Sequence, residues 1–265
     1  MTLITRPGYL WNETIWNPSM ILTALWFDAE DSSTIASSSN LVGQWNDKSG
    51  NARHATATSV YRPTYSATGL NSRPSLVSAR TGPTRMTLPT FTIGNQFHLF
   101  AVLNAANSGD YQYIFGNGSG GIGVLARTSA ALEDWQIGDA LSFGRDFVQA
   151  NNPRSIGPIT WSGPSVFYSA LGATTSTTEL NATRISTRVE ATNATAMTNT
   201  LPALFSPASN SITQSLEGSM SEFIMILGSL SLTNKQKLEG YLAHKWGLEA
   251  NLPSDHPYKT TGPTP

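Results

Sequence analysis

A chain of 265 residues with no cysteine and a formal net charge of −1 excludes several classes of protein at the outset. It can form neither a disulfide framework nor a thiolate metal site, and it lacks the basic patch that nucleic-acid binding needs. No run approaches the ~18 consecutive apolar residues of a membrane span, so no membrane insertion is expected. Charged residues make up only 12% of the chain, and Ser, Thr, Asn and Gly fill their place, which favours a turn-rich β protein.

Residues 1–22 are expected to form an arm in front of a single domain at 23–265. Trp11, Ile15 and Trp16 are apolar, but prolines and a glycine interrupt any regular element around them. The arm either packs back on its own domain or docks onto another subunit. The lack of a period-two pattern favours docking through these three residues, since exposed aromatic clusters mark interaction sites. The start also lacks the features of a signal peptide, so synthesis in a host cytoplasm is expected.

Short candidate strands follow one another along the chain, with turn residues between them. They cover residues 24–27, 97–103, 111–115, 121–126, 134–137, 140–143, 165–171 and 221–227. Many short strands separated by Gly and Asn turns predict an all-β sandwich or jelly roll. The last of these strands is apolar on both faces, so it should lie in the middle of a sheet under a covering layer.

The only strong helix signal runs from Thr233 to Trp246. Thr233 followed by Gln236 predicts a capping box, and Gly247 suits the left-handed residue that ends a helix. A lone amphipathic helix is unstable in water, so this helix must pack on the sheet. Its apolar face is expected to comprise Leu238, Tyr241, Leu242 and Trp246, and its solvated face Lys235, Lys237 and Lys245.

Candidates for sugar contact are aromatic residues with polar neighbours, because pyranose rings have apolar faces edged by hydroxyl groups. Asp110, Tyr111 and Tyr113 lie in one such segment, and Trp135 lies in another. Ordinary core strands explain the same composition, so both interpretations stay open.

Catalytic and metal signals are weak. Glycosidases need two carboxyl groups across a cleft, and no run of carboxylates at period two occurs, so the chain is expected not to be an enzyme. The four histidines are too scattered for a recognisable ligand spacing. No metal or other cofactor is therefore expected. Calcium is an open alternative, because Asn46, Asp47 and Asn51 supply oxygens on one turn, although an Asx-turn explains these residues equally well.

Two segments carry a resemblance to a known family. LWFDAED at 25–31 is followed by WNDKSGN at 45–51, His54 and RPTY at 62–65. Near the C-terminus, LTNKQKLEGYLAHKWGL is followed by LPSDHPYK. These motifs resemble laminin-G-like, concanavalin-A-like lectin domains of bacteriophage virion proteins and bacterial surface proteins. In one departure, VSAR at 77–80 replaces an apolar residue and an Asp-Gly pair that the family usually has.

The resemblance implies a concanavalin-A-like jelly-roll β-sandwich with one C-terminal α-helix packed on it, and structural hydrogen bonds for His54 and His256. It also implies a non-enzymatic structural protein of the bacteriophage virion, a capsid decoration or a tail or fibre component, that contacts host-surface glycans. Its partners would be other virion proteins, in a homo-oligomer or as capsid or tail subunits, and its location the virion. The alternative is a free-standing carbohydrate-binding lectin or a glycan-processing enzyme.

Overall fold

The computed structural model describes most of the chain. The described residues are 5–6, 9–10, 15–80, 82, 84–94, 96–106, 111–117, 122–127, 135–139, 163–171, 175–189, 197–199, 202–206 and 215–265. The expected strand at 140–143 lies outside this part.

The strands are β1 (Thr5–Arg6), β2 (Tyr9–Leu10), β3 (Leu25–Asp28), β4 (Ile35–Ser38), β5 (Leu41–Trp45), β6 (Ala55–Thr56), β7 (Thr64–Leu70), β8 (Arg73–Ser78), β9 (Met86–Thr87), β10 (Phe91–Gly94), β11 (Phe97–Ala105), β12 (Tyr111–Asn117), β13 (Ile122–Arg127), β14 (Trp135–Asp139), β15 (Ser165–Leu171), β16 (Thr175–Leu180), β17 (Thr183–Val189), β18 (Met197–Asn199), β19 (Pro202–Leu204) and β20 (Gly218–Leu227). The helical elements are α2 (Leu232–Trp246) and the short 3-10 turns η1 (Pro18–Met20), η2 (Ser32–Thr34), η3 (Ser59–Tyr61) and η5 (Glu249–Asn251).

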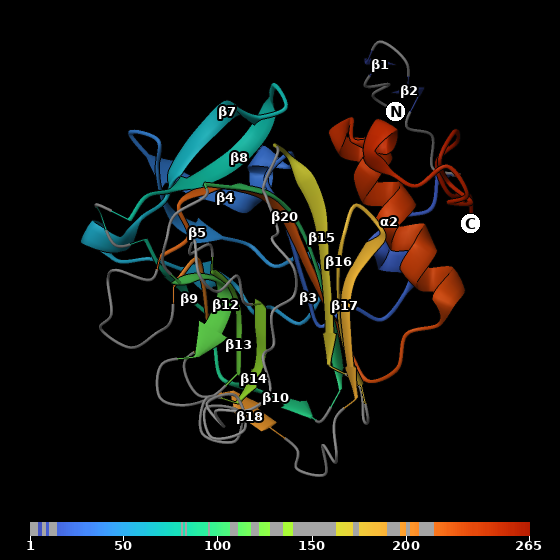
Figure 1. Cartoon of the computed structure of the whole chain (residues 1–265). Coiled ribbons are helices and arrows are strands. Elements are labelled where there is room, and N and C mark those ends of the chain that lie inside the picture. The colour runs from blue at the N-terminus through green and yellow to red at the C-terminus, as the bar shows by residue number, and fades with distance from the viewer. Residues whose placement is uncertain are drawn as a thin grey trace.

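Most of the described strands form one antiparallel sheet that curls back on itself into a sandwich (Figure 1), whereas β1-β2 and β10-β18 form two separate two-stranded sheets. Its order is β14-β13-β12-β19-β9-β6-β5-β7-β8-β20-β11-β15-β16-β17, with β3 beside β20 and β4 beside β5. Strands β12 and β20 are far apart in this order, yet the rings of Phe115 and Phe223 lie 5.7 Å apart. The two halves of the sheet therefore face each other across an apolar core, and the expected all-β sandwich with one packed helix is confirmed.

Strand β20 is central, as its sequence predicted. It pairs with β11 on one side and with β3 and β8 on the other. Phe223 and Met225 point into the core between the two sheet halves, whereas Ile224 and Ile226 pack in a second apolar layer under α2. Both faces are buried, because the second half of the sheet covers one and α2 covers the other.

Helix α2 begins earlier than its sequence suggested. The N-cap is Ser231, whose hydroxyl accepts a hydrogen bond from the amide of Asn234, so the predicted capping box at Thr233 was wrong. Ser caps as well as Thr, and the helix gains two residues by starting there. Gly247 ends the helix with a φ of 68°, as predicted. The four residues of the expected apolar face are all buried.

The docking role expected for Trp16 is contradicted. Its side chain is 3% exposed, and its ring meets Tyr241 of α2 edge-on at 6.3 Å between centroids. The amide of Trp16 also donates to the carbonyl of Pro263. Ile15 is half-buried, and Trp11 lies outside the described residues. The chain therefore joins the folded body by residue 16, before the expected boundary at 22, because α2 offers Trp16 an apolar site that the local sequence does not show.

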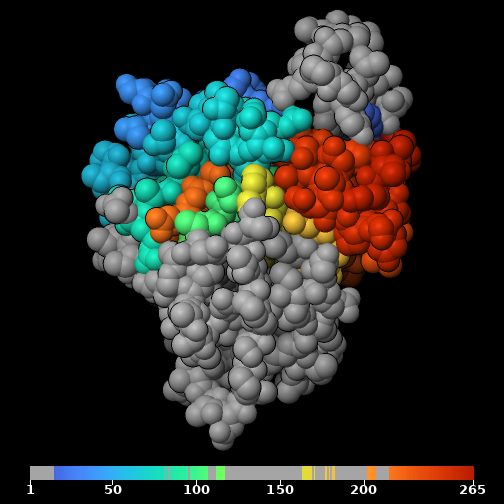
Figure 2. Space-filling view, turned by 45° about the horizontal axis from the view of Figure 1, so that its top comes forward, coloured from blue at the N-terminus to red at the C-terminus, as the bar shows by residue number. Residues whose placement is uncertain are grey.

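The β7–β8 hairpin reaches over to the end of α2. The side-chain amide of Asn71 at its tip donates to the carbonyls of Trp246 and Gly247 at 2.7 and 3.0 Å. Figure 2 shows the cyan hairpin against the red helix and tail. The contact supplies partners for carbonyls that a helix C-terminus leaves unpaired. Among the helices of the described part, none has the length and apolarity needed to cross a membrane.

Candidate functional site

Three of the residues expected to contact sugar lie on two strands of the sheet, Tyr111 and Tyr113 on β12 and Trp135 on β14. Strand β13 pairs with both β12 and β14, so that Gln112, Ala126 and Trp135 lie in one row. Paired residues share a face, and neighbours along a strand alternate. Tyr113 therefore belongs to the face opposite Trp135. Of the other two candidates, Tyr111 shares the face of Tyr113, and Asp110 lies outside the described residues.

The ring of Tyr113 lies over Gly116 of the same strand. A Cβ atom at Gly116 would come within 2.6 Å of Cδ1 of Tyr113, which is closer than atoms can approach. Glycine is thus the residue that lets this ring lie down along β12. Tyr113 remains partly exposed, so it offers an aromatic surface of the kind that stacks on sugar rings.

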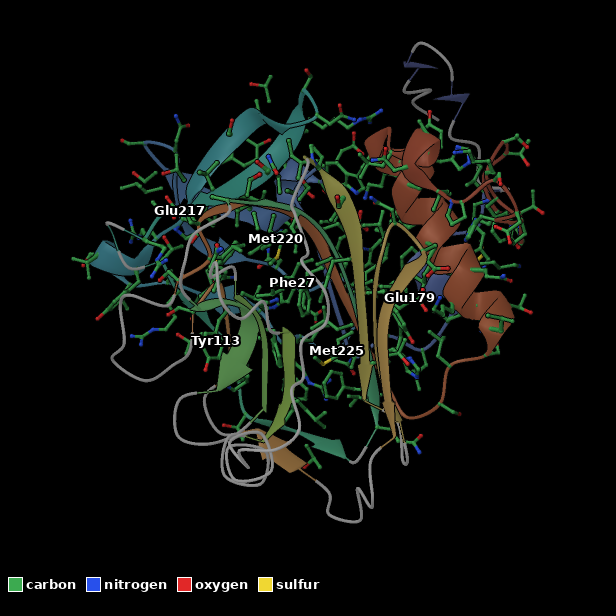
Figure 3. All side chains as sticks on the ribbon, in the orientation of Figure 1. Phe27, Tyr113, Glu179, Glu217, Met220 and Met225 are labelled. Carbon is green, nitrogen blue, oxygen red and sulfur yellow. The ribbon has the colours of Figure 1, made fainter. Side chains whose placement is uncertain are left out.

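The neighbouring Gln112 fixes this strand from its buried side. Its Nε2 donates to the carbonyl of Ala106, and its Oε1 accepts from the amide of Glu217, both at 2.8 Å. Glu217 itself is exposed. Figure 3 places Tyr113 and Glu217 on the side of the sandwich away from α2. The geometry supplies a partly exposed aromatic ring on a strand that is held in place from its buried side.

The turn at 45–51 uses its oxygens internally. The carboxylate of Asp47 accepts from the amides of Trp26, Ser49 and Arg53 and from the hydroxyl of Ser49, at 2.7–3.0 Å. These bonds fit the Asx-turn interpretation better than a calcium site, because the carboxylate oxygens already have donors. The side-chain oxygen of Asn46 accepts from the side-chain amide of Gln44, and the side-chain amide of Asn51 donates to the carbonyls of residues 23 and 24.

No group of three or more His, Asp or Glu side chains in the described part is placed to hold a metal ion. His54 Nδ1 accepts from the amide of Asp47, and His256 Nε2 lies 3.3 Å from Oε2 of Glu239. The structural hydrogen bonds expected for these two histidines are thus present.

A cluster of charged side chains lies buried between α2 and the sheet. Lys245 Nζ is 2.8 Å from Oδ1 of Asp28 and 2.7 Å from Oε2 of Glu222. Asp28 and Glu222 are direct partners across β3 and β20, so they lie on the same face. The expectation that Lys245 is solvated was therefore wrong: its side chain is 6% exposed. The missed signal is its position four residues after Tyr241, on the apolar side of the helix.

Four donors surround the Glu222 carboxylate. Oε1 accepts from Nε1 of Trp26 at 2.8 Å and from the hydroxyl of Tyr241 at 3.1 Å. Oε2 accepts from Lys245 and from Nε1 of Trp246, both at 2.7 Å. Two tryptophans, a tyrosine and a lysine thus converge on one carboxylate from two elements, β3 and α2. This arrangement fixes where α2 sits on the sheet.

Burial and charge pull the pKa values of this cluster in opposite directions. Burial raises the pKa of Glu222 above its ordinary value, and the Lys245 ammonium only partly offsets this. Burial also acts to raise the pKa of Asp28, but the Lys245 and Lys48 ammonium groups hold it below its ordinary value. Burial opposes the charge on Lys245, yet Asp28 and Glu222 raise its pKa well above the usual range.

A second ionic cluster joins the start of α2 to strand β16. Lys235 Nζ lies 2.7 Å from Oε2 of Glu179 and 2.6 Å from Oε1 of Glu239. Both carboxylates are nearly fully buried. The carboxylates of the two clusters thus neutralise lysines in closed contacts and do not face each other across an open cleft, as glycoside hydrolysis needs.

No family model and no curated protein matches the sequence, but solved structures do match the fold. The binding domain of Paraclostridial Mosquitocidal Protein 1 matches with a TM-score of 0.53 and 11% identity, over 83% of this chain and 53% of that one. Domain 4 of AbnA, a GH43 extracellular arabinanase from Geobacillus stearothermophilus, in complex with arabinotriose, matches with a TM-score of 0.53 and 11% identity, over 80% of this chain and 95% of that one.

A GH54 α-L-arabinofuranosidase matches with a TM-score of 0.51 and 14% identity, over 75% of this chain and 50% of that one. This chain therefore spans about half the length of the mosquitocidal binding domain and of the arabinofuranosidase, and nearly all of the arabinanase domain. At such identities the likeness concerns the fold alone. The chain therefore has a β-sandwich fold that these domains share.

Proposed function

We propose that this chain is a non-enzymatic, lectin-like structural protein of a bacteriophage particle that contacts glycans on the host surface. The observation that carries the glycan contact is the partly exposed ring of Tyr113, laid over Gly116 on β12. A rigid aromatic ring beside polar groups suits the apolar face of a sugar.

Two further lines support the proposal. The carboxylates of Asp28, Glu222, Glu179 and Glu239 are held by lysines, which favours a binding protein over a hydrolase. The fold is shared with a binding domain and with an arabinanase domain in complex with arabinotriose. The particle role rests on the motif resemblance at both ends of the chain.

Affinity electrophoresis tests the glycan contact. The chain should be retarded in gels that contain arabinan or purified bacterial envelope polysaccharide, and Tyr113→Ala should abolish the retardation. Tyr61→Ala is the matched control, because Tyr61 is also partly buried but lies on η3 beneath the guanidinium of Arg85. Equal loss in both variants, or no retardation at all, would exclude this surface as the glycan site.

Two measurements separate the proposal from its alternatives. Incubation with the same polysaccharides should release no reducing sugar, whereas release that depends on one carboxylate would favour a glycan-processing enzyme. Particles purified from a lysate that carries this gene should contain the chain in a fixed ratio to the capsid protein. A chain found only in the soluble fraction would favour a free-standing lectin.

A further inference from the structure

The buried cluster beneath α2 brings an amine, a carboxyl group and a second carboxyl group into one closed site. Lys245 Nζ contacts both Oδ1 of Asp28 and Oε2 of Glu222, at 2.8 and 2.7 Å. The three side chains are 6%, 6% and 0% exposed. A buried ion pair explains these contacts as they stand, but the further groups around the cluster match the requirements of a reaction.

The carboxyl group of Asp28 is polarised from its other side. Its Oδ2 lies 2.9 Å from Nζ of Lys48, and its Oδ1 also accepts from the amide of Glu30. A cation and an amide donor at these positions stabilise the negative charge that develops when a nucleophile attacks Cγ. Lys245 stands at one oxygen of this carboxyl group, and the charge-stabilising Lys48 stands at the other.

Glu222 is held where a general acid–base must be. Its hydrogen bonds to Trp26, Tyr241 and Trp246 fix the carboxyl group, and one of its oxygens meets the lysine proton that has to move. A group within hydrogen-bond reach of that proton satisfies the geometric requirement for acid–base catalysis. Holding all the groups in one closed site replaces an encounter in solution with a step at high effective concentration.

We propose that Lys245 and Asp28 become joined by an intramolecular amide bond, with Glu222 as the general acid–base. Glu222 takes a proton from the Lys245 ammonium, and the neutral amine attacks Cγ of Asp28. The Nζ–Cγ bond forms and the Cγ–Oδ1 bond breaks. The departing oxygen leaves as water, with one proton returned by Glu222 and one from the amine. An ammonium and a carboxylate become one amide and one water, so no oxidant, reductant or cofactor is needed.

The amide would leave fewer charges in the buried site than the ion pair does. The carboxylates of Asp28 and Glu222 hold Lys245 protonated, so the reaction begins only when its proton passes to Glu222, whose own pKa is raised by burial. Burying charge carries a desolvation cost, and the amide removes one positive and one negative charge from the site.

The bond would close a ring from residue 28 to residue 245 and so hold the first strand of the sandwich to its last helix. The chain has no cysteine, and this cross-link needs no oxidising compartment. A covalent link between distant residues stabilises the fold by restricting the unfolded chain. The inference is independent of the proposed glycan contact, because α2 and Tyr113 lie on different sides of the sandwich.

The mass of the intact, denatured full-length chain tests the proposal. It should be lower than the mass calculated from the sequence by one water, and proteolysis should yield one branched peptide that contains Asp28 and Lys245. A chain of full mass, or a water loss confined to a single linear peptide, would overturn the proposal. A purely ionic contact leaves the mass unchanged, so the two explanations are separated by the wild-type protein alone.

Variants then assign the roles. Lys245→Arg keeps the charge but removes the nucleophilic amine, so it should have full mass. Asp28→Asn should lose one ammonia in place of one water if it cross-links. Glu222→Gln should have full mass while circular dichroism shows a folded β protein. A cross-link that persists in Glu222→Gln would remove Glu222 from the reaction. Lys237→Arg, on the same helix outside the cluster, is the matched control and should keep the wild-type mass deficit.

Discussion

The sandwich has two buried layers of different chemistry. The layer between the two halves of the sheet is built almost wholly from apolar side chains, with Phe27, Trp45, Phe115 and Phe223 at its centre. The layer between the sheet and α2 is also apolar at its rim, but it encloses the charged cluster around Lys245. The same strand, β20, supplies side chains to both.

The two layers differ in how precisely they position the elements that pack on them. Apolar packing is favourable but tolerates substitution when total volume is kept. Charged groups in a buried layer must meet their partners, because an unpaired buried charge is strongly destabilising. The apolar layer therefore holds the two sheet halves together, and the charged layer selects one position for α2 on the sheet.

Removing the buried ammonium should have the largest effect. Lys245→Met would leave Asp28 and Glu222 side by side without their cation and would also prevent the proposed amide. We therefore expect a loss of at least about 3–5 kcal/mol in the free energy of unfolding. Lys237→Met on the same helix should change it by less than about 0.5 kcal/mol, as surface substitutions do. Denaturant unfolding measures both losses. Similar losses would mean that the two lysines contribute equally to stability and that the charged layer does not hold α2 in place.

A pair of tryptophan substitutions compares the two layers directly. Trp246 and Trp45 are both fully buried. The indole nitrogen of Trp246 donates to Glu222, whereas that of Trp45 has no hydrogen-bond partner among the described residues. Trp246→Phe should therefore lose about 1.5–3 kcal/mol more than Trp45→Phe, the range for a hydrogen bond to a charged group. If chemical denaturation gives equal losses in the free energy of unfolding, the lost side-chain volume alone explains the effect in both layers.

His98, at the rim of the charged layer, should make stability depend on pH. Burial lowers its pKa to about 4, the Lys235 charge acts in the same direction, and Nδ1 lies 2.9 Å from the hydroxyl of Tyr168. In the unfolded chain the pKa is about 6.5. Between these values only the unfolded chain binds the proton, so the stabilisation is fully present above about pH 6.5 and is lost as the pH falls toward 4.

Because the ring is only partly buried, we expect this loss to be about 2 kcal/mol, less than the full equivalent of the shift. It should be absent from His98→Gln. Thermal unfolding of both proteins from pH 7 to pH 4 gives the His98 effect as the difference between their pH profiles. Glu222 acts in the opposite direction, because its raised pKa stabilises the fold on acidification, and this contribution cancels in the difference. Parallel pH profiles would show that His98 is already protonated in the fold.

The smallest effect is expected at the hairpin tip that contacts the end of α2. Asn71→Gly keeps the left-handed backbone that Asn71 adopts at φ 48°, but it removes the amide that bonds the carbonyls of Trp246 and Gly247. The loss should be about 1 kcal/mol. Asn40→Gly is the matched control, because Asn40 also has a left-handed backbone, with φ 63°, and its side chain is exposed. If hydrogen exchange at the end of α2 does not rise in Asn71→Gly, the hairpin does not hold that helix end.

The local sequence pattern predicted the elements in which apolar residues recur at a regular spacing. Short apolar runs between turn residues predicted β3, β11, β12, β13, β14, β15 and β20 but missed β4 to β10. The two apolar faces of 221–227 placed that strand in mid-sheet. Helical spacing predicted α2 and its buried face. These predictions held because periodicity depends only on which sides of an element are covered.

Long-range contacts decided the rest. No local signal shows that Trp16 lies under α2, because the site that receives it is built more than 200 residues later in the chain. For the same reason Tyr113 and Trp135 looked alike in sequence, whereas the strand register places them on opposite faces.

Composition and periodicity predicted an all-β chain with one C-terminal helix, because they show on which side of each element the apolar residues lie. Which charged residues are buried with them depended on contacts between distant parts of the chain. Lys235, Lys237 and Lys245 lie on one helix, and Lys245 becomes a core residue because Asp28 and Glu222 meet on the sheet directly beneath it. Burial of a charge depends on its partners, and those partners come from strands far apart in the chain.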